Sequence, residues 1–483
     1  MASSFFFYDL ETSGFNPRAA RVMQFAGQRT GMDLQPVGEP VNVLIKLTPD
    51  VLPDPDAILV TGITPQQTIA DGVTEAEFLK NFQKEVATPG TIFVGYNSVR
   101  FDDEFMRYLQ YRNFYDAYEW QWKDNRSRWD LLDVVRMTRA LRPEGIEWPF
   151  APDGRPSNRL ELLTSVNKID HVGAHDALVD VRATIALAKL IQTRQPKLFG
   201  FLLDMRDKKK VAALVGARQP FVYTSGKYPS EFEKTTVAVM LADHPKKQGV
   251  LVYDLRHDPS EFAKMSAQGL VEAWRWKKDR AENGPQLPVK TLQFNRCPAV
   301  APPSVLDEAS QKRLQIDLKT IEANSKKLTE SADFVPKLLE ALDLLDREQK
   351  QAQLVGDEQA VDAQLYDGFF SDADCAGMQT VHSADPDELD SLAPSFRDNR
   401  LKALLSLYKA RNFPEALTPG ERGDWEKFCQ QRLAGGAQQS RLAKYFERLQ
   451  TLAAAPGVTK NQQYLLEELK LYGESIMPTN EET

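Results

Sequence analysis

The stretch "FFFYDLETSGFNP" (residues 5–17) decides the fold, because it joins a run of aromatic residues to two closely spaced acids. The aromatic run favours a buried β-strand. Side chains two residues apart on a strand point to the same face, so Asp9 and Glu11 project together from its end. Two neighbouring carboxylates repel unless a cation lies between them, and oxygen ligands suit Mg²⁺ or Mn²⁺. The pair by itself also fits two ordinary acids at an exposed strand end.

The composition is that of a globular protein with several domains. The chain has 483 residues, of which 42% are hydrophobic and 27% are charged. Its three cysteines lack CxxC spacing, so we expect neither a disulfide framework nor a zinc site. Such sparse cysteine usage suits a reducing cytoplasm. No stretch has the length of a membrane span or the pattern of a signal peptide, so we expect no membrane partner.

The net charge of −8 is distributed unevenly along the chain. Residues 196–300 carry 18 basic and 11 acidic side chains, a net charge of +7, whereas the segments before and after them carry −5 and −10. A basic middle segment favours contact with a polyanion, although a segment of this size can also reach such a value by chance.

Hydrophobic patterns predict a mixed α/β sheet in the first part of the chain. The predicted strands cover residues 5–10, 21–30, 41–47 and 90–97. The predicted helices cover residues 102–114, 127–142, 158–167 and 175–192, the last ending before Pro196.

The pattern changes after residue 195. Short β-like runs between residues 196 and 300 are separated by turns and predict a small β module. Residues 305–350 have a helical and charged pattern, and the polar stretch 349–364 is typical of a linker. We expect the remaining C-terminal residues to be helical.

Two later stretches add acids and a histidine to the first pair. "GYNSVRFDDEF" places Asp102 and Asp103 at the start of a predicted helix, and "HVGAHDALVD" contains His175 and Asp180. Acids favour helix starts and histidines are common in loops, so each stretch alone also has an ordinary structural explanation.

In order, the three motifs are D-x-E, N-x-x-x-F-D and H-x-x-x-x-D. This set resembles the DEDD exonucleases of the RNase H-like fold, in the variant with a histidine in the third motif. The resemblance matches Asp9 and Glu11 to the first motif, Asp102 to the second, and His175 and Asp180 to the third. Adjacent helical residues diverge, so we do not expect Asp103 to be a ligand, and the motif spacing selects Asp180 over Asp176.

Longer stretches resemble the bacterial exodeoxyribonuclease I family over essentially the whole chain. They include "FYDLETSGFNPR" (7–18), "SRWDLLDVVRMTRALRPEGIEWP" (127–149) and "DAQLYDGFFSDAD" (362–374). The resemblance implies an RNase H-like exonuclease domain at 1–195, an SH3-like DNA-binding module at 196–350 and a helical domain at 351–483.

The family's activity and partners are also implied by this resemblance. Its members remove nucleotides from the 3′ end of single-stranded DNA in long processive runs, release 5′-mononucleotides, and act in DNA repair and recombination. They bind the acidic C-terminal tail of single-stranded-DNA-binding protein. The chain length and one complete active site make a monomer the default expectation.

The family's chemistry uses two divalent cations, Mg²⁺ with Mn²⁺ as a substitute, which orient water and relieve charge at phosphorus. The resemblance implies that Asp9, Glu11 and Asp180 surround one ion, and that Asp9 and Asp102 hold the other. It implies that His175 takes a proton from the attacking water, as an imidazole can near neutral pH.

Single-stranded DNA is held by basic grooves and by aromatic side chains on which bases stack. By resemblance, Arg159 and Glu11 contact the nucleotide at the active site. The other predicted strand contacts are Phe15, Arg107, Tyr118, Trp120, Trp122, Arg136, Arg142, Lys208 and Lys277. Trp129 is instead predicted to be a core residue, since apolar positions flank it.

Three alternatives remain open at this point. An RNA-directed exonuclease of the same fold is generally much shorter, and a proofreading subunit would leave the last two domains unexplained. A non-catalytic scaffold on a dead nuclease fold would be expected to have lost at least one of the five motif residues, all of which are present.

Overall fold

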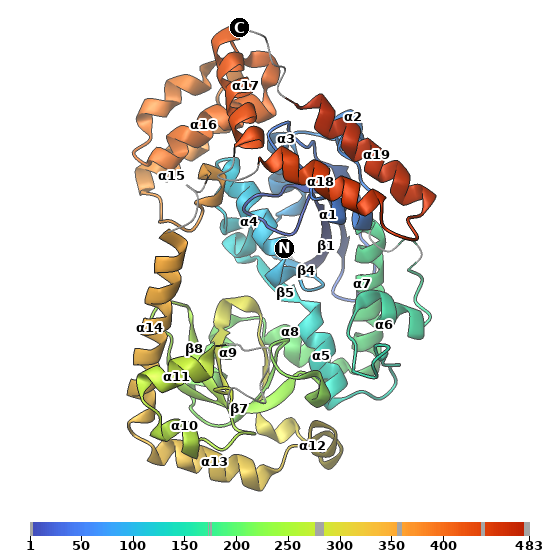
Figure 1. Ribbon diagram of the computed structural model, residues 1–483. Coiled ribbons are helices and arrows are strands. Elements are labelled where there is room, and N and C mark those ends of the chain that lie inside the picture. Colours follow the sequence, from blue (N-terminus) through green and yellow to red (C-terminus); the bar gives the residue numbers. More distant parts are fainter. Residues whose placement is uncertain are drawn as a thin grey trace. The chain divides into compact units, whose positions relative to one another are not determined.

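The computed structural model describes residues 3–171, 173, 176–275, 285–354, 360–435 and 440–477. The chain divides into two compact units (Figure 1). The first contains residues 1–127, 171–185 and 359–483, and the second contains residues 128–170 and 186–358. The motif acids at both ends of the exonuclease-like sequence therefore fall in the first unit.

The first sheet has the strand order β3-β2-β1-β4-β5 and is mixed. Strand β1 pairs antiparallel with β2 and parallel with β4. The strand bounds are β1 Ser4–Thr12, β2 Val22–Thr30, β3 Val41–Leu44, β4 Thr91–Gly95 and β5 Ser127–Asp130. The predicted α/β class and the four predicted strands are confirmed.

The predicted helix at 127–142 is wrong at its start, because β5 occupies its first four residues. Helix α5 then covers Leu131–Leu141. Trp129 lies in β5, is 3% exposed and packs edge-on against Phe199 at 5.0 Å, so the core prediction for this residue is confirmed.

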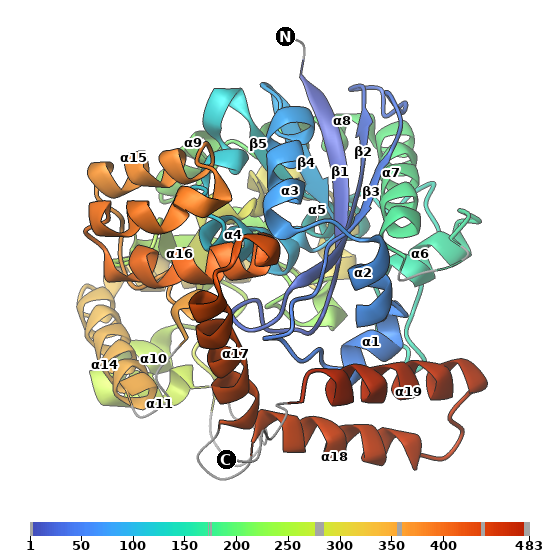
Figure 2. The same cartoon turned by 90° about the horizontal axis from the view of Figure 1, so that it is seen from above.

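Strand β1 is buried on both faces, which explains its continuous aromatic run. Phe6 and Tyr8 join a core with side chains of α3 (Glu75–Asn81) and α4 (Asp102–Arg112). Helix α7 (Ala177–Arg194) lies on the other side of β1 from α3 (Figure 2). The carboxyl end of β1 therefore emerges from a rigid core.

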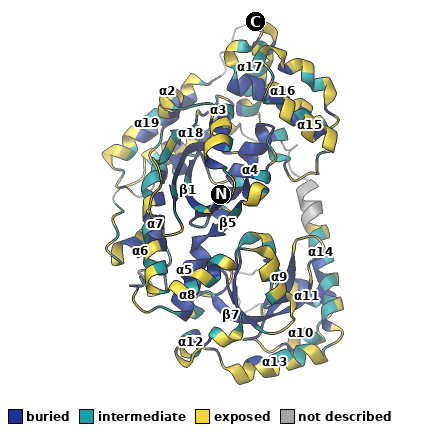
Figure 3. Ribbon diagram, turned by 180° about the vertical axis from the view of Figure 1, so that it is seen from behind, coloured by how far each residue is buried: buried dark blue, intermediate teal, exposed yellow. Residues whose placement is uncertain are grey.

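The second unit contains the predicted β module, an antiparallel sheet of order β10-β6-β7-β8-β9. Its strands are β6 Phe221–Thr224, β7 Thr235–Asp243, β8 Gly249–Asp254, β9 Val289–Gln293 and β10 Ala299–Ala301. The central strands of both sheets are buried, while helix α13 (Leu318–Glu330) is largely exposed (Figure 3).

The second unit contains more helices before and between the strands of this sheet than the sequence predicted. Those before and between its strands are α8 Pro196–Asp204, α9 Lys208–Gly216, α10 Ser260–Lys264 and α11 Ala267–Trp274. Short helices were missed here because their apolar positions are too few to establish a helical period.

The predicted linker at 349–364 is wrong at both of its described ends. Helix α14 (Phe334–Leu354) continues into it, and residues 361–363 form a short 3₁₀ turn in which Asp362 is fully buried. A stretch of polar residues has the same composition whether its charged side chains are buried in ion pairs or exposed in a linker.

The C-terminal residues are helical, as predicted. The helices are α15 Asp372–Val381, α16 Asn399–Asn412, α17 Pro419–Ala434, α18 Arg441–Ala453 and α19 Lys460–Ser475. Helices α18 and α19 pack beside α1 (Pro55–Thr61), and α19 also lies along α2 (Pro65–Asp71) (Figure 2). None of the described helices combines the length and apolar character that crossing a membrane requires.

Candidate active site

Three carboxylates gather at the end of β1. Asp9, Glu11 and Asp180 each offer an oxygen atom, and these atoms lie within 4.8 Å of one another. The pairing of β1 with β2 continues through Thr12, so the backbone that carries Asp9 and Glu11 is fixed by the sheet. Two acids from one strand and one from a distant helix therefore converge on a point.

The start of α7 is held in place beside Glu11. The backbone N–H of Ala177 donates to Gln24 Oε1 at 3.3 Å, and Gln24 is the β2 partner of Glu11. Asp176 caps the helix, because its Oδ1 accepts the backbone N–H groups of residues 178 and 179. Asp180 then projects from the first turn toward the β1 acids.

Burial and neighbouring negative charges raise the pKa values of the two β1 acids. Burial, followed by the charges of Asp102 and Asp180, raises the pKa of Asp9 well above its usual range. Burial, followed by Asp9 and Asp180, raises the pKa of Glu11 to about 9. Such a cluster of buried and half-buried oxygen ligands is unfavourable alone and fits a hard divalent cation such as Mg²⁺ or Mn²⁺.

Asp102 and Asp103 point in different directions from the start of α4. Asp103 is 1% exposed, and its Oδ1 accepts a hydrogen bond from the Tyr8 hydroxyl at 2.5 Å. Asp102 is 4% exposed, and its charge acts on Asp9. Asp103 thus satisfies a tyrosine hydroxyl in the core, whereas the charge of Asp102 acts on the carboxylate cluster.

The third motif contributes a histidine that sequence reasoning missed. His175 lies outside the described residues, as do its neighbours 172 and 174. The Nε2 atom of His171 lies 2.5 Å from Asp180 Oδ1, and the His171 side chain is 7% exposed. Its position as the first residue of "HVGAHDALVD" was the only available signal.

Several predicted strand contacts are accessible. Phe15 is 65% exposed and Trp122 is 61% exposed. The Arg159 side chain is 76% exposed and lies 3.9 Å from Glu161, while Lys208 is exposed at the start of α9. These side chains can meet a ligand without rearrangement.

Three predicted arginine contacts are engaged in ion pairs, and one predicted tyrosine contact is half-buried. Arg107 binds Glu104 at 2.7 Å and lies 5.4 Å from the centre of the half-buried Tyr118 ring. Arg136 binds Asp133 at 2.6 Å, and Arg142 binds Asp307 at 3.1 Å. Their ion pairs orient these guanidinium groups, and a phosphate would have to share them.

Two further predicted contacts have different outcomes. The prediction for Trp120 is wrong, because its side chain is 1% exposed and packs at 5.0 Å against Phe93 in the core. Trp122, two residues later, is exposed, and residue type alone does not separate a core tryptophan from a surface one. Lys277 lies outside the described residues.

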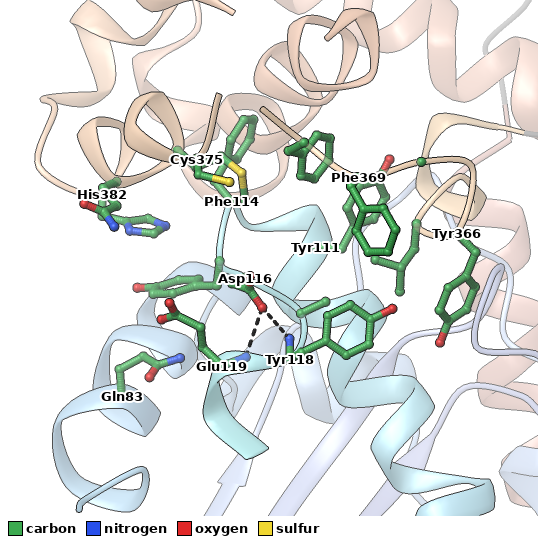
Figure 4. Close-up of a pocket in the computed structure, with 17 residues that line it drawn as sticks. Gln83, Tyr111, Phe114, Asp116, Tyr118, Glu119, Tyr366, Phe369, Cys375 and His382 are labelled. Carbon is green, nitrogen blue, oxygen red and sulfur yellow. Dashed lines mark hydrogen bonds between the residues drawn. The ribbon is translucent and has the colours of Figure 1, made fainter. Parts of the chain in front are cut away.

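A separate cavity of about 550 Å³ lies away from the carboxylates, within the first unit (Figure 4). Seven of its 17 lining residues are tyrosine or phenylalanine, among them the predicted strand contact Tyr118, Tyr366 and Phe369. Asp116 accepts the backbone N–H groups of Tyr118 and Glu119 at its edge. Phe369 is 97% exposed, so an unusually accessible ring borders this cavity.

The metal-free protein is expected to lose stability as pH rises from about 5 to 9. Glu11 keeps its proton in the folded state up to a pKa of about 9, whereas the unfolded chain releases it near 4.5. Between these values the folded state binds more protons, so the free energy of unfolding falls with increasing pH. Urea unfolding in the presence of a chelator, measured across this range, checks the slope.

The matched control for this slope is Glu11→Gln, which cannot titrate at this position. We expect the Glu11→Gln curve to be flatter than the wild-type curve over the same range. Added Mg²⁺ is expected to stabilise the wild type most at the alkaline end, because a cation replaces the lost proton. Parallel stability–pH curves for the wild type and Glu11→Gln would contradict the raised pKa of Glu11.

Three family models match successive parts of the chain. The model described as "Exonuclease" matches residues 6–188. "Exonuclease I SH3-like domain" matches residues 206–343, and "Exonuclease I C-terminal domain" matches residues 359–476. Together they cover most of the sequence in the order in which the three parts occur.

Relatives and solved structures match over nearly the whole chain. Exodeoxyribonuclease I from Escherichia coli is 41% identical, covering 98% of both chains, and that from Haemophilus influenzae is 40% identical, covering 98% of this chain and 99% of the relative. E. coli exonuclease I in complex with a dA16 oligonucleotide has a TM-score of 0.91 and 40% identity, covering 98% of this chain and 100% of the other.

Two further similar structures differ in what they contain. A zinc-bound form of the E. coli exonuclease I–single-stranded DNA complex has a TM-score of 0.90 and 39% identity. A structure described as single-stranded-DNA-binding protein (SSB)/exonuclease I in complex with an inhibitor has a TM-score of 0.88 and 39% identity. Each covers 99% of this chain and 100% of the matched chain.

Proposed function

Since the chain belongs to the exonuclease I family, we propose that it degrades single-stranded DNA processively from the 3′ end to 5′-mononucleotides. It is a nuclease with an exonuclease domain, and this family is metal-dependent. The observation that carries the proposal is the convergence of Asp9, Glu11 and Asp180 within 4.8 Å.

We propose Mg²⁺ as the cofactor, as two ions, with Mn²⁺ able to replace it. Asp9, Glu11 and Asp180 would hold one ion, and Asp102 together with Asp9 would hold the other. The bound ions would neutralise charge on the scissile phosphate and make a water molecule more acidic. The raised pKa values of Asp9 and Glu11 support this assignment, because a cation offsets the repulsion that raises them.

The remaining steps fall to residues of the chain. His175 would accept the proton of the attacking water. Arg159 and Glu11 would hold the terminal nucleotide, and the exposed Arg159 side chain suits a phosphate. The other contacts to the strand would be Phe15, Arg107, Tyr118, Trp122, Arg136, Arg142, Lys208 and Lys277.

The partners follow from the similar structures. Structures of E. coli exonuclease I contain single-stranded DNA, and another contains exonuclease I together with SSB. We propose that this chain binds the same two partners, the second through the acidic C-terminal tail of SSB. We further propose that it acts as a cytoplasmic monomer in DNA repair and recombination.

We propose domain limits of 1–195 for the exonuclease domain, 196–350 for the SH3-like module and 351–483 for the helical domain. The three family models match within these limits. The excess of basic side chains in the middle module supports a role in holding the strand rather than a proline-rich peptide.

Binding of single-stranded DNA is expected to weaken by about tenfold to a hundredfold between 50 and 200 mM salt, because each phosphate contact releases counterions. Fluorescence anisotropy of a labelled oligonucleotide, measured in a chelator, checks this slope. Lys208→Ala should reduce the slope of log affinity against log salt concentration by about one, because one phosphate contact is lost. Lys84→Ala, which changes an exposed lysine of the first unit, serves as the control and should leave the slope unchanged. A salt-independent affinity would contradict a phosphate-dominated surface.

Substrate choice is tested with single-stranded DNA, duplex DNA and RNA of the same sequence. Rapid loss of the single-stranded DNA alone is the expected result in Mg²⁺. Preferential loss of RNA would instead favour the ribonuclease branch of the fold, since the 2′-hydroxyl distinguishes the two strands. Binding without cleavage of any substrate would favour a scaffold.

A further inference from the structure

Five charged side chains form a buried ion cluster in the first unit, away from the carboxylate site. The side chains of Asp50 and Asp362 are 0% exposed, and those of Arg21, Arg411 and Arg432 are 3–8% exposed. Arg21 and Asp50 belong to the residues matched as the exonuclease domain, and the other three to those matched as the C-terminal domain. The cluster therefore joins two parts of the sequence that are more than 300 residues apart.

Asp362 is the centre of this ion cluster. Its Oδ2 accepts hydrogen bonds from Arg21 Nη2 at 3.0 Å and from Arg432 Nη1 at 2.7 Å. Arg411 donates to both Asp362 oxygens, at 2.8 and 2.9 Å, and also to Asp50 Oδ2 at 2.7 Å. One carboxylate thus fixes three guanidinium groups from three separate segments.

The charges of the cluster are strongly coupled. Burial acts to raise the pKa of Asp362, but the guanidinium groups, that of Arg411 foremost, hold the pKa well below its usual range. Burial and the nearby Arg112 lower the pKa of Arg21 to about 9 despite the pull of Asp362. Buried ion clusters contribute little net stability, but removing one partner leaves an unpaired buried charge. Such a cluster can serve to define one arrangement of the segments that it joins.

Arg21 connects this ion cluster to the carboxylate site. Its backbone N–H donates to Ser13 Oγ at 2.8 Å, and the Ser13 N–H donates to the Arg21 carbonyl at 2.8 Å. The Ser13 carbonyl accepts from the Asp54 N–H at 2.7 Å. Ser13 follows Glu11 by two residues, so these bonds close the loop 13–21 directly beyond the β1 acids.

We propose that Asp362 is a positioning residue for hydrolysis: through Arg21 it fixes the loop 13–21 and thereby the end of β1 that carries Glu11. The C-terminal domain then contributes to the rate of phosphodiester hydrolysis as well as to the binding of a long DNA strand. This inference rests on the proposed exonuclease function. It assigns a catalytic consequence to a residue that contacts neither the predicted cations nor the strand.

The test is Asp362→Asn in the full-length protein, with kcat and KM measured on a trinucleotide and on a long single strand. We expect kcat to fall by about tenfold to a hundredfold on both substrates, because small displacements of catalytic groups have effects of this size. KM should change by less than about threefold, since the strand contacts remain. Equal loss on the two substrates separates a positioning role from a role in processivity alone.

The matched control is Asp56→Asn. Asp56 forms a two-pronged ion pair with Arg448 at 2.6 and 2.8 Å, which also joins the exonuclease and C-terminal parts but lies at the surface. This variant should retain wild-type kcat on both substrates. A similar loss in Asp56→Asn would show that any weakened contact between these parts has the same effect, and would overturn the proposal.

Ser13→Ala keeps the proposal testable if Asp362→Asn does not fold. This change removes the hydroxyl that accepts from Arg21 and leaves the ion cluster intact, so we expect lower kcat with a thermal midpoint close to that of the wild type. Full kcat in a folded Asp362→Asn or in Ser13→Ala would overturn the proposal. A wild type without nuclease activity would instead overturn the proposed function, so the two failures are distinguishable.

Discussion

Replacing Asp9 by asparagine is expected to remove nearly all turnover while stabilising the metal-free fold. Burial and the charges of Asp102 and Asp180 oppose the ionised form of Asp9 and raise its pKa. Charge stabilisation by a bound cation is worth several kcal/mol, so its loss should lower kcat by about a thousandfold. Removing one repelling carboxylate should raise the free energy of unfolding in a chelator by about 1–2 kcal/mol at pH 8.

Asp103→Asn is the matched control for this experiment. Asp103 lies on the same turn as Asp102, but its oxygen accepts from Tyr8 in the core. We expect this variant to retain activity and to gain no stability. Steady-state kinetics with saturating Mg²⁺ and urea unfolding in a chelator measure the two quantities. An active Asp9→Asn enzyme, or one less stable than the wild type, would contradict the metal-site assignment.

His175→Ala is expected to lower kcat by about a hundredfold to ten-thousandfold, the usual contribution of a general base. The acidic limb of the pH–rate profile should disappear with it, because that limb reports the deprotonation of the imidazole. Kinetics between pH 5.5 and 9 at saturating Mg²⁺ provide the measurement. The fold should remain intact, as checked by thermal unfolding.

His257→Ala provides the control for a general effect of histidine removal. Its side chain is 54% exposed and belongs to the second unit, so we expect unchanged kcat and an unchanged profile. Normal turnover in His175→Ala would contradict the general-base role. The same variant with His171 also replaced would then test whether the histidine 2.5 Å from Asp180 takes the proton instead.

The exonuclease-like sheet and its acids could be predicted because their signals are local. The aromatic run of β1 predicts a strand buried on both faces, and the spacing of Asp9 and Glu11 follows from the strand period. The start of β5 was misassigned because Trp129 fits both the strand and the spacing of the following helix. Local periodicity cannot separate these two states over four residues.

The buried ion cluster could not be predicted, because its partners are far apart in the sequence. Asp362 stands in a polar stretch whose composition is typical of a linker, and only folding brings Arg21 and Arg411 to it. The same reason applies to one of the arginines predicted as strand contacts, because the ion-pair partner of Arg142, Asp307, is identified by the tertiary structure alone.

Digestion of 5′-end-labelled single-stranded DNA, with and without a chelator, tests the role of the β1 acids most directly. With Mg²⁺, we expect a ladder of labelled products that shortens from the 3′ end and an accumulation of 5′-mononucleotides. Chelation should stop the reaction. The Asp180→Asn variant should not digest the DNA even with Mg²⁺. Shortening that persists in the chelator, or immediate release of the labelled 5′ nucleotide, would contradict a metal-dependent 3′–5′ exonuclease built on Asp9, Glu11 and Asp180.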